Sequence, residues 1–113
     1  MMATVSVIVV NYNAGELLDR CLDSLRLREA EPAAEVILVD NGSTDGSAER
    51  AAGRQPEVTF IPAGANLGFA GGVRRGAAEA SGTILFLLNP VRPCTLYQAV
   101  NHGLLDLQGS VFS

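Results

Sequence analysis

Residues 35–47 read EVILVDNGSTDGS, an apolar run that ends in an acid and passes directly into turn-forming residues. The run Glu35–Asp40 is short, β-branched and almost wholly apolar, which predicts a strand covered on both faces. The Gly, Asn, Ser and Asp residues after it predict a tight loop, followed by a short helix over Ser47–Gly53. A carboxylate at the end of a buried strand is often functional, so Asp40 is a candidate site residue.

Strand and helix alternate along most of the chain. Further strands are predicted over Val5–Val10, Val58–Ile61 and Thr83–Leu88. Asn13 and Glu16 resemble a capping box for a first helix, whose apolar face starts at Leu17. A helix of small residues is predicted over Ala70–Ala80. This order predicts an α/β fold, with a mostly parallel sheet and helices on both faces.

Composition excludes several function classes. The 113 residues fit one domain, and the net charge of −4 argues against a nucleic-acid binder. All eight basic residues are arginine, which excludes a P-loop lysine or a Schiff-base lysine. The single histidine, His102, makes no histidine metal site alone. The two cysteines match no metal or redox spacing, and Cys21 is expected to be a buried thiol, with a disulfide as the alternative. No membrane span or signal peptide is visible, so a cytoplasmic protein is expected.

Polar side chains follow each predicted strand at its carboxyl end. They are Asn11, Asn13, Asp40, Asn41, Asn66 and Asn89. At the opposite edge, Glu35, Glu57 and Thr83 are expected to be ordinary strand flanks. Since ligands of open α/β sheets bind at the carboxyl edge, the pattern predicts a small-molecule crevice there.

Three features allow more than one interpretation. Asp40 can accept from a nucleobase or a ribose, hold a metal, or cap the next helix. Glycines from Gly68 onward let backbone N–H groups approach an anion, with Arg74 and Arg75 one turn on. The alternative is a helix packed closely on the sheet with two solvated arginines. Tyr12 can stack on a base or cover the edge of the core, whereas Phe60, Phe69 and Phe86 are expected in the core.

Four motifs occur in order, at Val5–Asn13, Val39–Ser47, Asn66–Gly72 and Leu87–Pro90. Together they resemble glycosyltransferase family 2, most of all its rhamnosyltransferase-like members, over about residues 4–90. The resemblance implies a truncated GT-A fold, the Rossmann-like nucleotide-binding half only. It also implies a nucleotide-diphospho-sugar partner of the dTDP or UDP type, Mg²⁺ or Mn²⁺, and an inverting glycosyl transfer.

The resemblance also implies roles for particular residues. Asn11, Tyr12 and Asn13 border the base, and Asp40 binds base or ribose. Asn41 and Ser43 line the same pocket. The Asn66–Gly72 loop closes over the nucleotide, and Arg75 lies near the diphosphate. The implied nucleotide-sugar set is Asn11, Tyr12, Asn13, Asp40, Asn41, Ser43, Asn66, Gly68, Gly71, Gly72, Arg75 and Asn89.

The sequence departs from the family after Pro90. Val91 stands where the family has its metal-binding Asp, and valine cannot ligate a hard cation, so the metal is in doubt. Val73 and Arg74 replace a pair of asparagines. The family's acceptor site and catalytic base lie beyond this stretch, so no residue here is assigned a catalytic role. Residues 1–90 are therefore expected to form the nucleotide-sugar-binding half and residues 91–113 a divergent tail, with a short amphipathic helix carrying Leu96, Ala99, Val100, Leu104 and Leu107.

Two functional hypotheses follow. The first is a glycosyltransferase-like protein that binds a nucleotide-diphospho-sugar but is inactive as this chain alone. The second is a non-catalytic binding or assembly module that keeps the GT-A scaffold. A nucleotidyltransferase or a receiver domain fits less well, because both need a lysine. An exposed edge at the fourth strand predicts a homo-oligomer.

Overall fold

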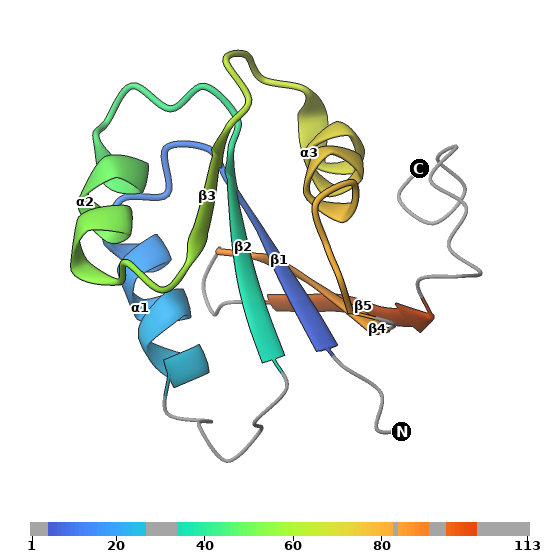
Figure 1. Cartoon of the computed structure of the whole chain (residues 1–113). Helices are drawn as coiled ribbons and strands as arrows, with labels where there is room; N and C mark the ends of the chain where they lie inside the picture. Colours follow the sequence, from blue (N-terminus) through green and yellow to red (C-terminus); the bar gives the residue numbers. More distant parts are fainter. Residues whose placement is uncertain (1–4, 27–33, 83, 91–94, 102–113) are drawn as a thin grey trace.

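The computed structural model describes residues 5–26, 34–82, 84–90 and 95–101 (Figure 1). Up to β4 its elements alternate as the sequence predicts, with their ends shifted by a few residues. In chain order they are β1 (Val5–Asn11), α1 (Glu16–Arg26), β2 (Ala34–Asp40), α2 (Ser47–Arg54), β3 (Thr59–Pro62), α3 (Gly68–Ala77), β4 (Ile84–Asn89) and β5 (Thr95–Asn101).

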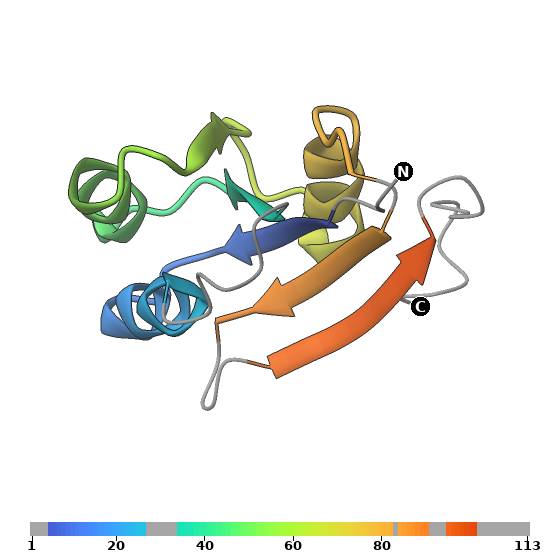
Figure 2. The same ribbon diagram turned by 60° about the horizontal axis from the view of Figure 1, so that its bottom comes forward.

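The sheet has the strand order β3-β2-β1-β4-β5. Strands β1 to β4 run parallel, and β5 pairs antiparallel with β4. Helices α1 and α2 cover one face and α3 covers the other (Figures 1 and 2). After β3 the chain returns across the opposite face to β4, so the strand order reverses between β1 and β4. The predicted α/β sheet with helices on both faces is confirmed.

Alternate residues of each strand build two separate cores. Val7 and Val9 of β1 face α1 and α2, where they pack with Leu18, Leu22 and Leu38. Ile8 and Val10 face α3 and pack with Ile37, Val39, Val73 and Leu87. Helix α3 approaches β1 closely because it carries glycine at the contact: a Cβ at Gly76 would lie 2.7 Å from Ile8 Cγ2.

The predicted capping box at the start of α1 is wrong. Asn13 adopts a left-handed backbone, with φ 50°, and α1 begins only at Glu16. The Asn13 Oδ1 atom accepts hydrogen bonds from the backbone N–H groups of Thr44 and Asp45, at 2.8 and 3.2 Å, instead of capping its own helix. The Asn13 side chain therefore binds the loop after β2, not the first turn of α1.

The predicted helix in the tail is also wrong over the described residues. Residues Thr95–Asn101 form β5, whose register pairs Phe86 with Ala99. The backbone groups along the outer edge of β4 need partners, and a strand supplies them where a helix cannot. Leu104 and Leu107 lie outside the described residues. Because β5 covers β4, the edge on which the homo-oligomer was predicted is not open; the oligomeric state stays a prediction.

Cys21 lies on the buried face of α1, as expected, but it is disulfide-bonded, so the expectation of a free thiol there is wrong. Cys94 lies outside the described residues. Within the described part of the chain, no helix has the length and apolar character needed to cross a membrane.

Candidate functional site

A cavity of about 490 Å³ opens at the carboxyl edge of the sheet. Val10 and Tyr12 line it from the end of β1, and Pro90 lines it from the end of β4. It therefore lies where the strand order reverses, which is the usual ligand position in open α/β sheets. Among the described residues, its lining comprises Val10, Tyr12, Asn13, Ala14, Leu17, Asn41, Asn66, Gly68, Phe69 and Pro90.

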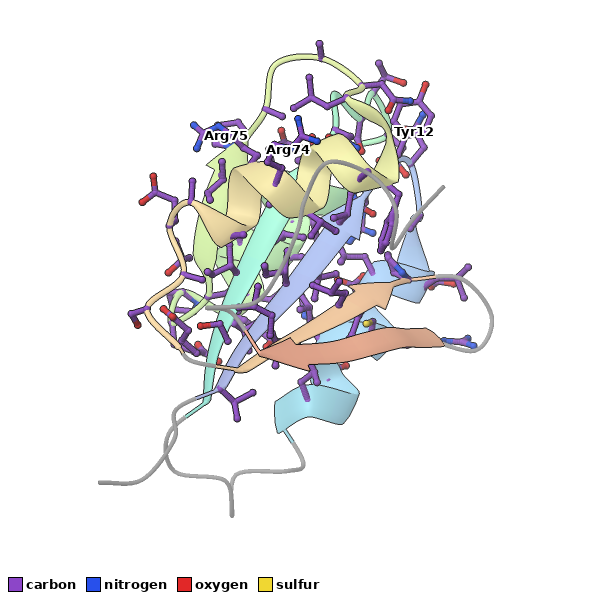
Figure 3. The ribbon with its side chains drawn as sticks, turned by 90° about the vertical axis from the view of Figure 1, so that its right-hand side faces the viewer. Tyr12, Arg74 and Arg75 are labelled. Atoms are coloured by element: carbon purple, nitrogen blue, oxygen red, sulfur yellow. The ribbon has the colours of Figure 1, made fainter. Side chains whose placement is uncertain are left out.

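One wall of the cavity is the loop between β1 and α1, residues Tyr12–Ala14. Tyr12 is 53% exposed, so it does not cover the core, and its ring is free to contact a ligand. Figure 3 shows Tyr12 near one end of α3, with Arg75 toward the other. The loop is tied to the loop after β2, because Asn13 N donates to Ser43 Oγ at 2.8 Å.

The opposite wall is built around Gly68 at the start of α3. Asn41 Nδ2 donates to the Gly68 carbonyl at 2.9 Å, and Gly68 N donates to Asn66 Oδ1 at 2.9 Å. Gly68 has φ +77°, which favours glycine. Asn41 is only 2% exposed, and its Oδ1 atom has no hydrogen-bond partner among the described residues. This wall therefore keeps an acceptor whose hydrogen bond is unmade.

Behind the cavity, Asn11 joins three acceptors. Its Nδ2 atom lies 3.0 Å from Asp40 Oδ1, 3.1 Å from Ser43 Oγ and 3.0 Å from Ser47 Oγ. Ser43 Oγ in turn donates to Asp40 Oδ1 at 2.6 Å, and Ser47 Oγ donates to Asp45 Oδ1 at 2.6 Å. Since both hydroxyls already donate elsewhere, the Asn11 group that faces them must be the amide NH₂. Asn11 Oδ1 is then left buried without a partner in the described structure.

Asp40 belongs to this inner cluster. It is 5% exposed and accepts from Asn11, from the Ser43 hydroxyl and from Ser43 N at 3.1 Å. It does not line the cavity, and neither do Asn11 and Ser43. Asn11 and Asp40 are directly paired across β1 and β2, and both face α1 and α2, whereas Val10 and Asn41 face α3. Of the residues predicted to bind the nucleotide-sugar, some therefore line the wall of the cavity, and others form a polar cluster behind that wall.

The remaining predicted residues lie elsewhere. Gly72 packs on β1, where a Cβ would lie 2.6 Å from Val10 Cγ1, and a Cβ at Gly71 would lie 2.7 Å from Leu67 Cβ. Arg75 is in the last turn of α3, 3.8 Å from Glu79 in an exposed ion pair. These positions support close packing for the two glycines and do not support a diphosphate contact by Arg75. Asn89 ends β4, and its side chain is outside the described part.

Two residues at the candidate site, Phe69 and Asp45, are not among the residues predicted from the sequence to form it. Phe69, expected in the core, packs on its border and lines the cavity. Asp45 links both loops: Oδ1 accepts from Ser47 N and Oγ, and Oδ2 accepts from Gly15 N at 3.1 Å. The hydrogen bonds from the Ser47 hydroxyl and then from backbone N–H groups outweigh burial and lower the pKa of Asp45. Its signal was its place in the motif Val39–Ser47.

Among the described residues, no group of three or more His, Cys, Asp or Glu side chains comes together. The Asp40 carboxylate is engaged by three protein donors. Val91 lies outside the described residues.

Comparisons with known proteins agree with this geometry. An N-acetylglucosaminyl-diphospho-decaprenol L-rhamnosyltransferase of Mycobacterium tuberculosis is 43% identical over 79 residues, which cover 70% of this chain and 25% of that protein. A mannosyltransferase of Pyrobaculum calidifontis, solved with GDP-Man and Mn²⁺, superposes with a TM-score of 0.70 at 28% identity, over 80% of this chain and 28% of that one.

The glucosyl-3-phosphoglycerate synthase of M. tuberculosis, solved with Mn²⁺, UDP and phosphoglyceric acid, shares the fold, with a TM-score of 0.65 at 23% identity; the match covers 78% of this chain and 33% of that one. The chain spans about a quarter of the length of the curated rhamnosyltransferase that it matches. The profile of glycosyl transferase family 2 matches residues 6–90. The chain therefore belongs to glycosyl transferase family 2 and has the sheet topology of its GT-A fold.

Proposed function

We propose that this chain is the nucleotide-recognition part of a family 2 glycosyltransferase, and that its cavity binds the nucleotide of a UDP- or dTDP-linked sugar. The observation that carries the proposal is the position of the cavity. It opens between the carboxyl ends of β1 and β4, and all four family motifs contribute to its lining. Its volume of about 490 Å³ is in the range of small-ligand sites.

The side chains around the cavity suit a pyrimidine nucleotide. An exposed tyrosine ring offers a stacking surface for a base, and such stacking contributes about 1–3 kcal/mol. Tyr12 provides that ring. Asn13, Asn41 and Asn66 supply amides, and an amide both donates and accepts, as the imide edge of uracil or thymine requires. Asn41 Oδ1 itself is buried and has no partner among the described residues.

The proposed division of the chain follows the family match. Residues 1–90 would bind the nucleotide-sugar, and residues 91–113 would form a tail of their own, of which β5 joins the same sheet. Sugar transfer needs a base for the acceptor's proton and stabilisation of the departing diphosphate. The described residues supply neither a base at the cavity nor a metal cluster. We therefore assign binding to this chain and no transfer step.

Calorimetric titration with UDP and dTDP tests the proposal. The unchanged chain is expected to bind saturably, and Tyr12→Ala to weaken binding about tenfold, which equals about 1.4 kcal/mol. Leu67→Ala is a matched control, because Leu67 is another exposed large apolar side chain near the start of α3 but does not line the cavity. Absence of binding at millimolar nucleotide would contradict the proposal.

The second candidate, a non-catalytic module on the same scaffold, is favoured by Val91. Repeating the titration with Mn²⁺ separates the two. If the metal site is lost, Mn²⁺ leaves the affinity of the unchanged chain as it is, and Val91→Asp makes the affinity rise with Mn²⁺. If Mn²⁺ already raises the nucleotide affinity of the unchanged chain, then Val91 has not abolished the metal site. The hypothesis of a non-catalytic module then loses its support.

A further inference from the structure

The two loops at the carboxyl edge are held together by side chains that do not line the cavity. Ser43 Oγ accepts from Asn13 N at 2.8 Å, and Asp45 Oδ2 accepts from Gly15 N at 3.1 Å. These two bonds are made on either side of Ala14. They therefore fix both ends of the segment Asn13–Ala14, and with it the Tyr12–Ala14 wall of the cavity.

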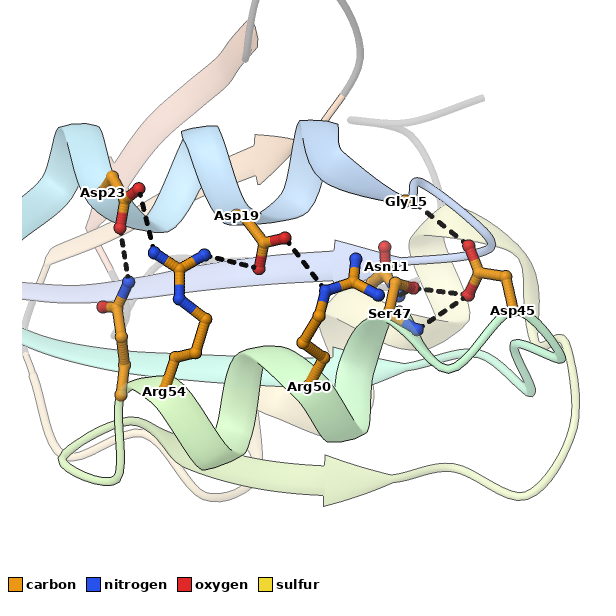
Figure 4. A network of polar contacts seen from close by, with 9 residues as sticks. Asn11, Gly15, Asp19, Asp23, Asp45, Ser47, Arg50 and Arg54 are labelled. Atoms are coloured by element: carbon orange, nitrogen blue, oxygen red, sulfur yellow. Dashed lines mark hydrogen bonds and ion pairs between the residues drawn. The ribbon is translucent and has the colours of Figure 1, made fainter.

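The linkage also runs in the other direction. Asn13 Oδ1 accepts from Thr44 N and Asp45 N, so the loop after β2 is held by the loop after β1. The Asp45 carboxylate is fixed in turn by Ser47, whose N and Oγ both donate to Oδ1. Figure 4 shows Asp45 between Gly15 and Ser47, at the loop end of the contact between α1 and α2. We call the bonds made by Asn13, Ser43 and Asp45 the loop clasp.

We propose that Ser43 and Asp45 are positioning residues, which hold Tyr12 and Asn13 in the conformation that forms the nucleotide-facing wall. They act through the loop and do not touch the ligand. The inference rests on the proposed function, and it changes the role of Ser43 from a pocket contact to a support. Asn13 needs such support because a left-handed backbone is uncommon for a residue other than glycine.

Asp23 offers a matched control. It also joins α1 to α2, since its Oδ1 accepts from Gln55 Nε2 at 3.0 Å and its Oδ2 lies 3.6 Å from Arg54 Nη2. It lies at the far end of the same helix pair from the cavity (Figure 4). Loss of Asp23 therefore removes a carboxylate link between these helices without removing a bond of the loop clasp.

The test uses tyrosine fluorescence. The chain has no tryptophan and two tyrosines, so Tyr97→Phe leaves Tyr12 as the reporter. In that background, Asp45→Ala is expected to raise quenching of Tyr12 by acrylamide and to weaken UDP binding about tenfold. Ser43→Ala is expected to act in the same direction. Asp23→Ala is expected to lower the melting temperature without changing the quenching or the affinity.

Two results would overturn the inference. One is unchanged Tyr12 quenching in both Asp45→Ala and Ser43→Ala; the other is an equal rise in Asp23→Ala, which would indicate general loosening. If Asp45→Ala does not fold, Asp45→Asn is used, because its one carbonyl oxygen can replace only part of the carboxylate's bonds. The quenching needs no ligand, so a chain that binds no nucleotide refutes the proposed function while the quenching still decides whether the clasp positions Tyr12.

Discussion

The amino and carboxyl edges of the sheet both gather polar side chains around a carboxylate, but they use them differently. At the amino edge, Glu35 Oε2 accepts from Ser6 Oγ, Ser81 N and Ser81 Oγ, and Gly82 N donates to Ser6 Oγ. Among the described residues, the amino edge has no buried side-chain oxygen or nitrogen without a partner, whereas the carboxyl edge has two, Asn11 Oδ1 and Asn41 Oδ1. Both edges thus have a polar cluster, and the carboxyl edge differs by its two unpaired buried oxygens and by the cavity beside them.

The largest expected effect is at the amino edge. A Cβ at position 82 would lie 2.6 Å from Ser6 Oγ, 2.7 Å from Ser6 N and 2.9 Å from the Val5 carbonyl carbon. Gly82→Ala should therefore lower the free energy of unfolding by about 3 kcal/mol, since backbone atoms must move. Denaturant unfolding measures it. Gly53→Ala is the control, because nothing lies within 4 Å of a Cβ there, and a neutral Gly82→Ala would contradict the close contact.

Asn11→Ala should cause the second largest loss of stability. It removes the donor shared by Asp40, Ser43 and Ser47 in a residue with no exposed surface. We expect a loss of about 2 kcal/mol in unfolding free energy, because buried acceptors lose their partner. We also expect weaker UDP binding. Unchanged stability in urea unfolding would show that the inner cluster does not hold the carboxyl edge together.

Glu35→Gln should have a smaller effect that depends on pH. Burial raises the pKa of Glu35, but hydrogen bonds from Ser6, Ser81 and Gly82 outweigh it and leave the pKa below 4.5. The ionised form is therefore the one that stabilises the fold, fully above pH 4.5, and its contribution is lost as the pH falls through the lowered pKa.

Glu35→Gln should lower the free energy of unfolding by about 1 kcal/mol at pH 7, and this difference from the unchanged chain should disappear in more acidic solution. Thermal melts across this pH range measure it, with Glu57→Gln as an exposed control. A stability difference that stays constant with pH would rule out the ionised carboxylate of Glu35 as its cause.

The smallest effect is expected for Arg75→Ala. The Arg75–Glu79 pair is exposed and 3.8 Å apart, and such pairs contribute at most about 1 kcal/mol. Neither stability nor UDP affinity should change measurably. A clear loss of affinity would restore the predicted contact of Arg75 with the diphosphate and move the site along α3.

Much of the fold was predictable because it follows from local patterns. The apolar runs of β1 and β2 are buried on both faces, and parallel strands bring Asn11 and Asp40 to one edge by necessity. The polar residues divide between the cavity wall and the inner cluster because successive side chains of a strand point to opposite faces of the sheet. Asn11 therefore lies on the same face as Val7 and Val9. This alternation can be read directly from the sequence.

Other features depend on partners far along the chain. Asn13 has the right spacing for a capping box, but its oxygen binds the loop 31 residues later. The pattern of Leu96, Ala99 and Val100 fits a helix, yet the exposed backbone of β4 selects a strand. The sequence predicts Glu35 as an ordinary strand flank, but its carboxylate accepts a hydrogen bond from Ser81 N, 46 residues away. Local periodicity contains no information about such pairings.

Heteronuclear NMR of the labelled chain, titrated with UDP, tests most directly whether the carboxyl edge alone is the binding site. We predict saturable shifts at Tyr12, at Asn13, at the Asn41 and Asn66 side-chain amides and at Gly68, with the Ser81 and Gly82 signals unmoved. Shifts centred on Ser81 and Gly82, or saturable binding that leaves Tyr12 and Asn41 unperturbed, would contradict it.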